Sequence, residues 1–245
     1  MEPWNLIFQH KYAEVAAAYN EILKDSPDDK LALAARASAL LCMGNLRDAN
    51  SEFARANELD KRKSGGESSG YSDDLAVTHW LLAERSEAML VLKEVIDGLR
   101  TNRVQYADLA GGASHGLLLW YMALIEEDDG SKEYSLAFLD ELVAKRALSK
   151  CWPRILALFV LDRVTFDEVL IDIGESRRLW FIERRARKDL HVRDQLCKAK
   201  FYLGAKQLER GKEIDYRKLL AECAALENPI IVPEWFIAKS VTEGS

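Results

Sequence analysis

Two serines of this sequence stand in the pattern Gly-x-Ser-x-Gly, which holds the nucleophilic serine in many hydrolases. They are Ser68, in GESSG, and Ser114, in GASHG. A nucleophile elbow needs a strand before the serine and a helix after it, so that the hydroxyl sits on a sharp turn. Neither serine follows a strand-like stretch. We therefore expect neither to be catalytic, and we read GGASHG as a helix start with Ser114 near the cap and glycines that allow close packing.

The sequence contains no motif for binding a metal ion or a phosphate group. None of the four histidines (His10, His79, His115 and His191) has a second ligand three or four residues away, and HExxH, CxxC and Walker A patterns are absent. The acidic run EEDDGS, residues 126–131, does not continue over the roughly twelve positions of an EF-hand. It predicts a solvated turn between helices. We expect no cofactor, no bound metal and no enzymatic activity.

A basic segment, SRRLWFIERRARKDLHVR at residues 176–193, is the next candidate. It has seven Lys or Arg and two acids, so it carries +5 in a chain whose net charge is −6. Its apolar residues recur at helical spacing, which predicts an amphipathic helix. The arginines can neutralise acidic helices of the same fold, contact an acidic partner or bind nucleic acid, and these uses stay open. Because aromatic and Arg side chains are typical of interface hot spots, the candidate partner-binding residues here are Arg177, Arg178, Trp180, Arg184 and Arg185.

Composition indicates an all-α globular protein. The 245 residues are 49% hydrophobic and 30% charged, with only five prolines. Ala, Leu, Glu, Lys and Arg dominate, and these residues favour helix. Runs typical of strands are nearly absent. The aromatic side chains, among them Trp80, Trp120 and Tyr121, lie mostly in apolar runs and are expected in the core.

The charge and the cysteines of the chain indicate its cellular location and the kind of partner it suits. A pI near 5.4 makes nucleic acid an unlikely partner. The start, MEPWNLIFQHKY, is no signal peptide, and no apolar run approaches the ~20 residues that span a bilayer. The four cysteines (Cys42, Cys151, Cys197 and Cys223) are far apart and unpatterned. They are typical of reduced core cysteines, so we expect a cytoplasmic protein without membrane association.

The most specific signal is an internal repeat. Tyr12, Val15, Tyr19 and Ile22 align at an offset of 34 residues with Leu46, Ala49, Phe53 and Ala56. Positions i, i+4 and i+7 of each copy share one helix face, which predicts a buried stripe on both helices. LALAARASALLCMGN lies between them and predicts a partner helix that ends at Gly44.

These residues resemble the tetratricopeptide repeat, whose unit is an antiparallel helix pair of 34 residues. CKAKFYLGAKQLERGKEIDYRKLLAECAA resembles a further unit, with Leu203, Gly204, Gly211, Leu220 and Cys223 at motif positions. Tyr216 departs from the motif, which usually has Ala there, so we expect looser or shifted packing between those two helices.

The resemblance implies a domain organisation. It implies N-terminal repeats at 1–60, a Gly/Ser-rich loop at 61–72, and degenerate helical repeats at 73–245 ending in a repeat-like unit. Together they would form one continuous superhelical array of roughly 12–14 helices. Residues 110–240 also resemble the C-terminal half of NlpI-type bacterial tetratricopeptide lipoproteins. That family implies an all-helical adaptor, although this chain lacks its lipoprotein signal and lipid-bearing cysteine.

Stacked helix pairs present a concave surface lined by the first helix of each pair. In LALAARASALLCMG the residues expected to face it are Leu31, Ala34, Ser38 and Leu41. They lack the Lys and Asn with which some repeats clamp a C-terminal carboxylate. We therefore expect a non-enzymatic scaffold or adaptor that docks a partner protein. The alternative is an immunity protein that neutralises a cognate bacterial toxin, since an acidic surface complements a basic nucleic-acid-handling toxin. The oligomeric state stays open.

Overall fold

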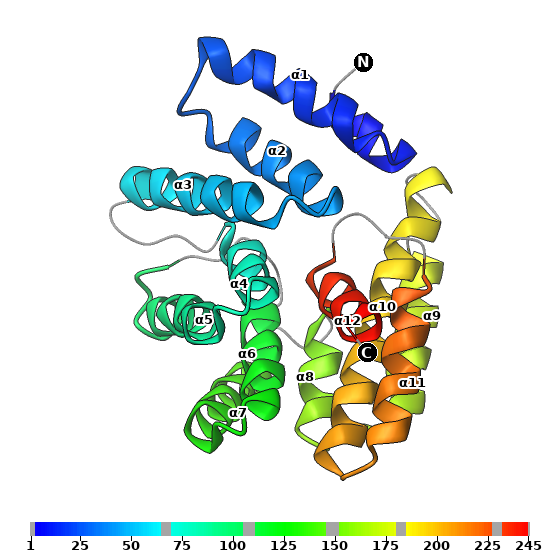
Figure 1. Cartoon of the computed structure of the whole chain (residues 1–245). Coiled ribbons are helices and arrows are strands. Elements are labelled where there is room, and N and C mark those ends of the chain that lie inside the picture. The colour runs from blue at the N-terminus through cyan, green and yellow to red at the C-terminus, as the bar shows by residue number, and fades with distance from the viewer. Residues whose placement is uncertain are drawn as a thin grey trace. The chain divides into compact units, whose positions relative to one another are not determined.

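The computed structural model describes residues 3–64, 70–104, 111–145, 152–179, 185–226 and 232–244, and within these ranges the chain is helical with no strand. The all-α fold predicted from composition is confirmed (Figure 1). Twelve α-helices and one 3-10 helix are described, in the order η1 (Pro3–Gln9), α1 (Tyr12–Asp25), α2 (Lys30–Cys42), α3 (Leu46–Ser64), α4 (Ser72–Leu81), α5 (Arg85–Arg100), α6 (Ala113–Ile125), α7 (Asp129–Ala144), α8 (Arg154–Val160), α9 (Phe166–Leu179), α10 (Arg185–Glu209), α11 (Glu213–Ala224) and α12 (Pro233–Glu243).

The helices fall into two compact units, Met1–Tyr106 and Ala107–Ser245. The N-terminal unit holds η1 and α1 to α5, and the C-terminal unit holds α6 to α12. The sequence predicted one continuous array with a Gly/Ser-rich loop at residues 61–72. The helices on either side of that loop, α3 and α4, pack against each other within the N-terminal unit.

Consecutive helices pack in sequence order within the N-terminal unit. Ala49, Phe53 and Ala56 are fully buried on α3, and Val15 is fully buried on α1, which confirms most of the predicted repeat face. Between α2 and α3 the chain reverses at Gly44, whose φ of +80° lies in the left-handed region that glycine favours. The amide of Asn45 there donates to the Leu40 carbonyl at 2.9 Å, closing the end of α2 as predicted.

Two details of the N-terminal unit differ from the sequence prediction. Ile22, expected on the buried face of α1, is 38% exposed, and Leu23 is buried instead. Helix α1 packs against α2 and the short η1. In addition, α3 continues to Ser64 and enters the predicted loop. Lys and Arg favour helix, and Arg62 extends α3 by pairing with Glu58 one turn earlier, at 3.1 Å.

Helix α10 is the centre of the C-terminal unit, where it contacts α6, α8, α9, α11 and α12. Aromatic side chains fill its contact with α6. The rings of Tyr121 and Phe201 lie 4.5 Å apart between centroids, and those of Trp120 and Tyr202 lie 6.5 Å apart. All four side chains are buried, so the prediction of core positions for Trp120 and Tyr121 is confirmed.

Helix caps in the C-terminal unit follow from local sequence. Thr165 and Glu168 form a reciprocal capping box at the start of α9, with the Thr165 amide donating to Glu168 at 2.7 Å and the Glu168 amide donating to Thr165 at 3.3 Å. Asp128 caps α7 by accepting from the Ser131 amide at 3.0 Å. Residues 126–128 of the acidic run therefore form a turn between α6 and α7, as predicted, and residues 129–131 begin α7.

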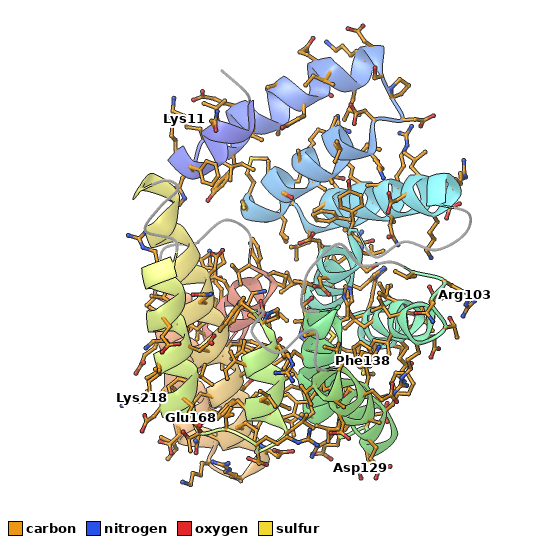
Figure 2. All side chains as sticks on the ribbon, turned by 180° about the vertical axis from the view of Figure 1, so that it is seen from behind. Lys11, Arg103, Asp129, Phe138, Glu168 and Lys218 are labelled. Atoms are coloured by element: carbon orange, nitrogen blue, oxygen red, sulfur yellow. The ribbon has the colours of Figure 1, made fainter. Side chains whose placement is uncertain are left out.

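Two glycines allow helices of the C-terminal unit to approach closely. A Cβ atom at Gly116 of α6 would lie 2.8 Å from the ring of Phe138 on α7, a residue labelled in Figure 2. At Gly204 of α10 a Cβ atom would lie 2.8 Å from Leu220 Cδ1 and 3.3 Å from Leu219 Cβ, both on α11. Figure 1 shows α10 and α11 side by side as a hairpin.

The prediction of looser packing at Tyr216 is wrong. The backbone carbonyl of Tyr216 lies 3.5 Å from the Cβ position of Gly204, so the two helices are in close contact at this point. Tyr216 is accommodated because its side chain points toward α6, where its hydroxyl shares a buried hydrogen bond of 2.9 Å with the Tyr121 hydroxyl. A large residue at a small-residue position thus joins a third helix to the hairpin.

Among the described helices, none is long and apolar enough to cross a bilayer.

The close approach at Gly204 yields a stability prediction. Gly204→Ala should lower the free energy of unfolding by about 1–2 kcal/mol, because overpacking of a buried contact outweighs the gain in helix propensity. Gly174→Ala is the matched control, since Gly174 lies within α9 and nothing stands within 4 Å of its Cβ position. That variant should be neutral or more stable by up to about 1 kcal/mol. Urea unfolding of both variants measures the difference, and equal effects would contradict the proposed close packing.

Candidate functional site

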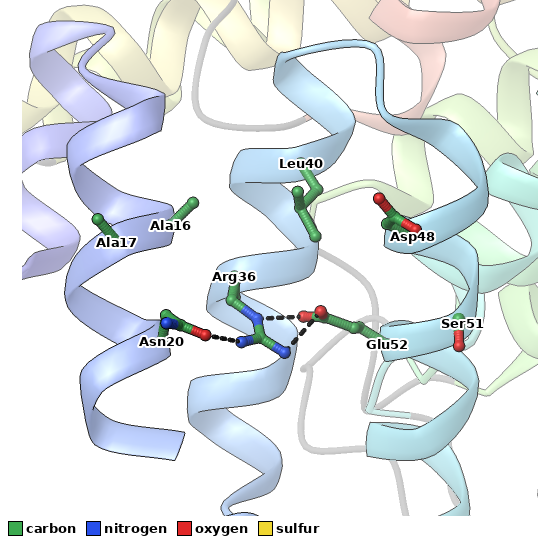
Figure 3. A pocket seen from close by; sticks show the side chains of 8 residues that line it. All are labelled: Ala16, Ala17, Asn20, Arg36, Leu40, Asp48, Ser51 and Glu52. Atoms are coloured by element: carbon green, nitrogen blue, oxygen red, sulfur yellow. Dashed lines mark hydrogen bonds and ion pairs between the residues drawn. The ribbon is translucent and has the colours of Figure 1, made fainter. Parts of the chain in front are cut away.

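The candidate site is a pocket of about 460 Å³ in the N-terminal unit, which we call the α1–α3 groove. Side chains of α2 lie between those of α1 and α3 in this groove (Figure 3). The lining residues are Ala16, Ala17 and Asn20 of α1, Arg36 and Leu40 of α2, and Asp48, Ser51 and Glu52 of α3.

Small side chains leave this space open. Ala17 and Ser51 are separated by 34 residues and so occupy equivalent positions in the two repeats. Both are exposed and line the groove from opposite sides. Larger residues at either position would fill the space between α1 and α3. The groove thus lies between two helices that present a small side chain at positions 34 residues apart.

An arginine in the groove ties three helices together. The Arg36 guanidinium donates from Nε to Glu52 Oε2 at 2.8 Å, and its second terminal nitrogen lies 2.7 Å from Glu52 Oε1. The other terminal nitrogen donates to Asn20 Oδ1 at 2.8 Å (Figure 3). The Arg36 and Glu52 side chains are 21% and 17% exposed. A bidentate, half-buried pair of this kind is among the stronger ionic contacts in proteins.

The groove carries a net negative charge. Glu52 is offset by Arg36, whereas the exposed Asp48 one turn earlier on α3 makes no hydrogen bond or ion pair within the described part of the chain. Leu40 adds an apolar surface beside these groups. The arrangement offers a carboxylate, an amide and a hydroxyl next to an aliphatic wall, which suits a partner side chain with a cationic or hydrogen-bond-donating end.

The predicted concave residues on α2 have different environments from one another. Ala34, Ser38 and Leu41 are buried, and the Ser38 hydroxyl donates to the Ala34 carbonyl at 2.9 Å. Leu31 is 69% exposed. The groove therefore opens on a different face of α2, the one that carries Arg36 and Leu40. Sequence reasoning missed Arg36 and Glu52, although opposite charges on two helices of one predicted hairpin were a usable signal.

Residues of the basic segment 176–193 lie largely outside the described part of the structure. Arg177 and Arg178 belong to the last turn of α9, and Arg185 begins α10. Trp180 and Arg184 fall outside the described residues, as do the side chains of residues 176–191. What these arginines contact, within the fold or on a partner, therefore remains a prediction.

The serine and histidine candidates also have defined places. Ser114 is buried in the first turn of α6, whose N-cap is Gly112, so GGASHG is a helix start as predicted. Ser68 lies outside the described residues. His79 pairs with Glu84 at 2.6 Å, and His115 is fully buried. In the described ranges no three His, Cys, Asp or Glu side chains come together as a group that could hold a metal ion.

A buried polar group in the C-terminal unit was not predicted; we call it the 194–234 cluster. Asp194, Lys198 and Tyr202 recur every four residues on α10 and so share the face toward Glu234 of α12. Glu234 is 1% exposed; Tyr202 donates to its Oε1 at 2.9 Å, and Lys198 Nζ lies 3.7 Å from its Oε2. The i, i+4, i+8 spacing was visible in the sequence, but a polar stripe ordinarily indicates a solvated face.

In this cluster, burial disfavours the ionised form of Asp194. Burial raises the pKa of Asp194 to about 7, the Lys198 ammonium opposes that rise, and the Glu234 carboxylate adds to it. Its Oδ1 atom is buried and accepts no hydrogen bond within the described residues. Asp194 therefore costs the folded state free energy whenever it is ionised.

A second ionic network joins α7, α10 and the turn between α8 and α9. Lys206 is buried on α10, and its ammonium lies 2.8 Å from Asp162 Oδ2, 2.7 Å from Glu209 Oε2 and 3.2 Å from the Val160 carbonyl. Lys132 of α7 also pairs with Glu209, at 2.9 Å. The polar groups are mutually satisfied, so this network anchors the turn and holds no open position for a ligand.

A double-mutant cycle on Arg36 and Glu52 tests the groove contact. Replacing each by Ala, singly and together, should give a coupling free energy of about 1–2 kcal/mol, because the pair is bidentate and half-buried. Arg55 and Asp28 form the control pair, joined at 2.7 Å but 51% and 70% exposed. Their coupling should stay below about 0.5 kcal/mol. Equal coupling for the two pairs in denaturant unfolding would show that burial does not strengthen the groove pair.

The raised pKa of Asp194 predicts a pH-dependent stability. Below its ordinary value of 3.8 the group is protonated in both folded and unfolded chains. As pH rises from 3.8 to about 7, the unfolded state ionises first, so the folded state loses stability. Asp194→Asn removes this loss and should be more stable than the wild type by about 1–3 kcal/mol near pH 8, with little difference near pH 3.5.

Thermal melts across that range measure the effect, with Asp215→Asn as the control for an exposed carboxylate on α11. A stability difference between Asp194→Asn and wild type that does not change with pH would show that Asp194 titrates alike in both states.

No protein-family model matches the sequence, and no curated protein matches it. The likeness to tetratricopeptide repeats therefore rests on the residues described above, together with the helical pairs that they form.

Proposed function

We propose that the chain is a non-enzymatic scaffold that docks a partner protein on its helical-repeat surface, at the α1–α3 groove. This proposal rests on the groove, which combines an aliphatic wall with polar groups in a pocket of about 460 Å³. That size is within the range of pockets that hold small ligands or a few partner side chains. The half-buried Arg36 fixes the three helices around it, so the binding surface is formed before a partner arrives.

The charge of the groove favours a basic partner segment. Arg36 offsets the charge of Glu52, so Asp48 gives the groove its net negative charge. The whole chain has a net charge of −6. A Lys or Arg side chain can lay its methylene stem along Leu40 and place its charged end near Asp48. Complementary charge of this kind accelerates association more than it adds affinity.

Groove filling tests the proposal. Ala17→Trp places a large side chain in the groove, whereas Ala13→Trp places the same side chain on an exposed position of α1 that does not line it. A partner captured by the wild-type chain from its own cells should be identified, purified and titrated against all three proteins. We expect Ala17→Trp to weaken binding at least ~10-fold, and Ala13→Trp to bind as the wild type does.

Circular dichroism of both variants must match the wild type, so that lost binding reports the groove and not unfolding. Undiminished binding by Ala17→Trp would place the partner elsewhere. A partner that binds one-to-one and thereby loses its own activity would make the chain an inhibitor of the immunity-protein kind. Several partners that retain activity would favour an adaptor.

A further inference from the structure

Two cysteines that are far apart in the sequence meet inside the C-terminal unit. Cys197 lies on α10 and Cys223 on α11, 26 residues later, and both side chains are fully buried. Their Sγ atoms are 2.8 Å apart, and the Cys223 thiol also reaches the Cys197 carbonyl at 3.5 Å. The sequence spacing gave no hint of this pair, because only the α10–α11 hairpin brings the two residues together.

The surroundings hold this pair in place. Cys197 and Cys223 are on facing sides of the hairpin that close packing at Gly204 brings together. Two sulfur atoms placed 2.8 Å apart need little movement to reach the length of a disulfide bond.

We propose that Cys197 and Cys223 are a site of disulfide formation that cross-links α10 to α11. The oxidant class is a low-molecular-weight disulfide such as oxidised glutathione. The thiolate of one cysteine attacks the glutathione disulfide, forming a mixed disulfide and releasing one reduced glutathione. The second cysteine thiolate then attacks the protein sulfur of that mixed disulfide and releases the second glutathione. Two electrons and two protons leave the protein dithiol, and one glutathione disulfide becomes two thiols.

Burial controls when this reaction can occur. The neighbouring Cys223 thiol and burial together raise the pKa of Cys197, so the closed hairpin holds Cys197 as a protonated, unreactive thiol. The reaction with glutathione disulfide therefore takes place when the hairpin is open, during folding or after local unfolding. Once the bond has formed inside the closed hairpin, the same burial keeps reductants from reaching it. The cross-link is therefore slow to form and persistent, unlike that of a surface redox sensor.

The cross-link should stabilise the C-terminal unit. A bond that closes a loop of 26 residues restricts the unfolded chain and leaves the native hairpin nearly unchanged. We expect the melting temperature of the oxidised protein to exceed that of the reduced protein by about 5–10 °C. This inference concerns the C-terminal unit and does not depend on the function proposed for the groove.

Refolding under defined redox conditions tests the proposal. The full-length wild type is unfolded, refolded with oxidised or reduced glutathione, alkylated in denaturant without reductant, and mapped by mass spectrometry. The oxidised sample should yield a peptide linked through Cys197 and Cys223, with Cys42 and Cys151 alkylated. Free Cys197 and Cys223 after refolding with oxidised glutathione would overturn the proposal, and so would glutathione adducts on both or linkage to Cys42 or Cys151.

Two variants separate the cross-link from other oxidation. Cys42→Ser/Cys151→Ser keeps only the proposed pair and should retain the full shift in melting temperature between oxidised and reduced samples. Adding Cys197→Ala to this variant should abolish both the linked peptide and the shift. A shift that survives in the triple variant would show that another modification stabilises the oxidised protein. The mapping of the wild type decides the matter even where a variant folds poorly.

Discussion

Close approach of paired helices at small residues is the constraint on which both units depend. Helices without strands can bury their apolar stripes only against each other, and the depth of that burial is limited by the side chains at the crossing. Gly204 lets α10 meet α11, Gly116 lets α6 meet α7, and Ala49 and Ala56 do the same for α3. The aromatic core around Trp120 and Phe201 lies between α6 and α10, the helices that carry Gly116 and Gly204.

Other small residues leave space for the candidate binding surface. Where a repeat places alanine or serine on the outer side of a hairpin, the space that is not filled by a neighbouring helix becomes a groove. Ala17 and Ser51 leave that space, and Arg36 spans it to reach Glu52 and Asn20. An ionic contact at this position stabilises three helices while leaving polar groups open to a partner. Arg36 thus contributes both to stability and to the shape of the candidate binding surface, so a substitution at Arg36 affects both.

Sequence patterns predicted the features that depend on neighbours along the chain. The all-helical fold, the buried face of α3 and the turn at Gly44 all follow from residues within two helical turns or 34 residues of each other. Features that depend on the register between helices were missed or wrong. Tyr216 was expected to loosen a hairpin, but α6 supplies a hydroxyl for it. The Arg36–Glu52 pair and the Cys197–Cys223 pair likewise exist only once two helices are aligned.

The two units place their polar groups differently, and this difference has a chemical consequence. In the N-terminal unit the groove charges are half-buried or exposed, so they are free to respond to a partner. In the C-terminal unit α10 contacts five other helices and carries buried ionisable groups along much of its length. Asp194 lowers stability when it is ionised, and the proposed disulfide would change the oxidation state of Cys197. The candidate binding surface therefore lies in the N-terminal unit, and the groups that respond to pH and to oxidation lie in the C-terminal unit.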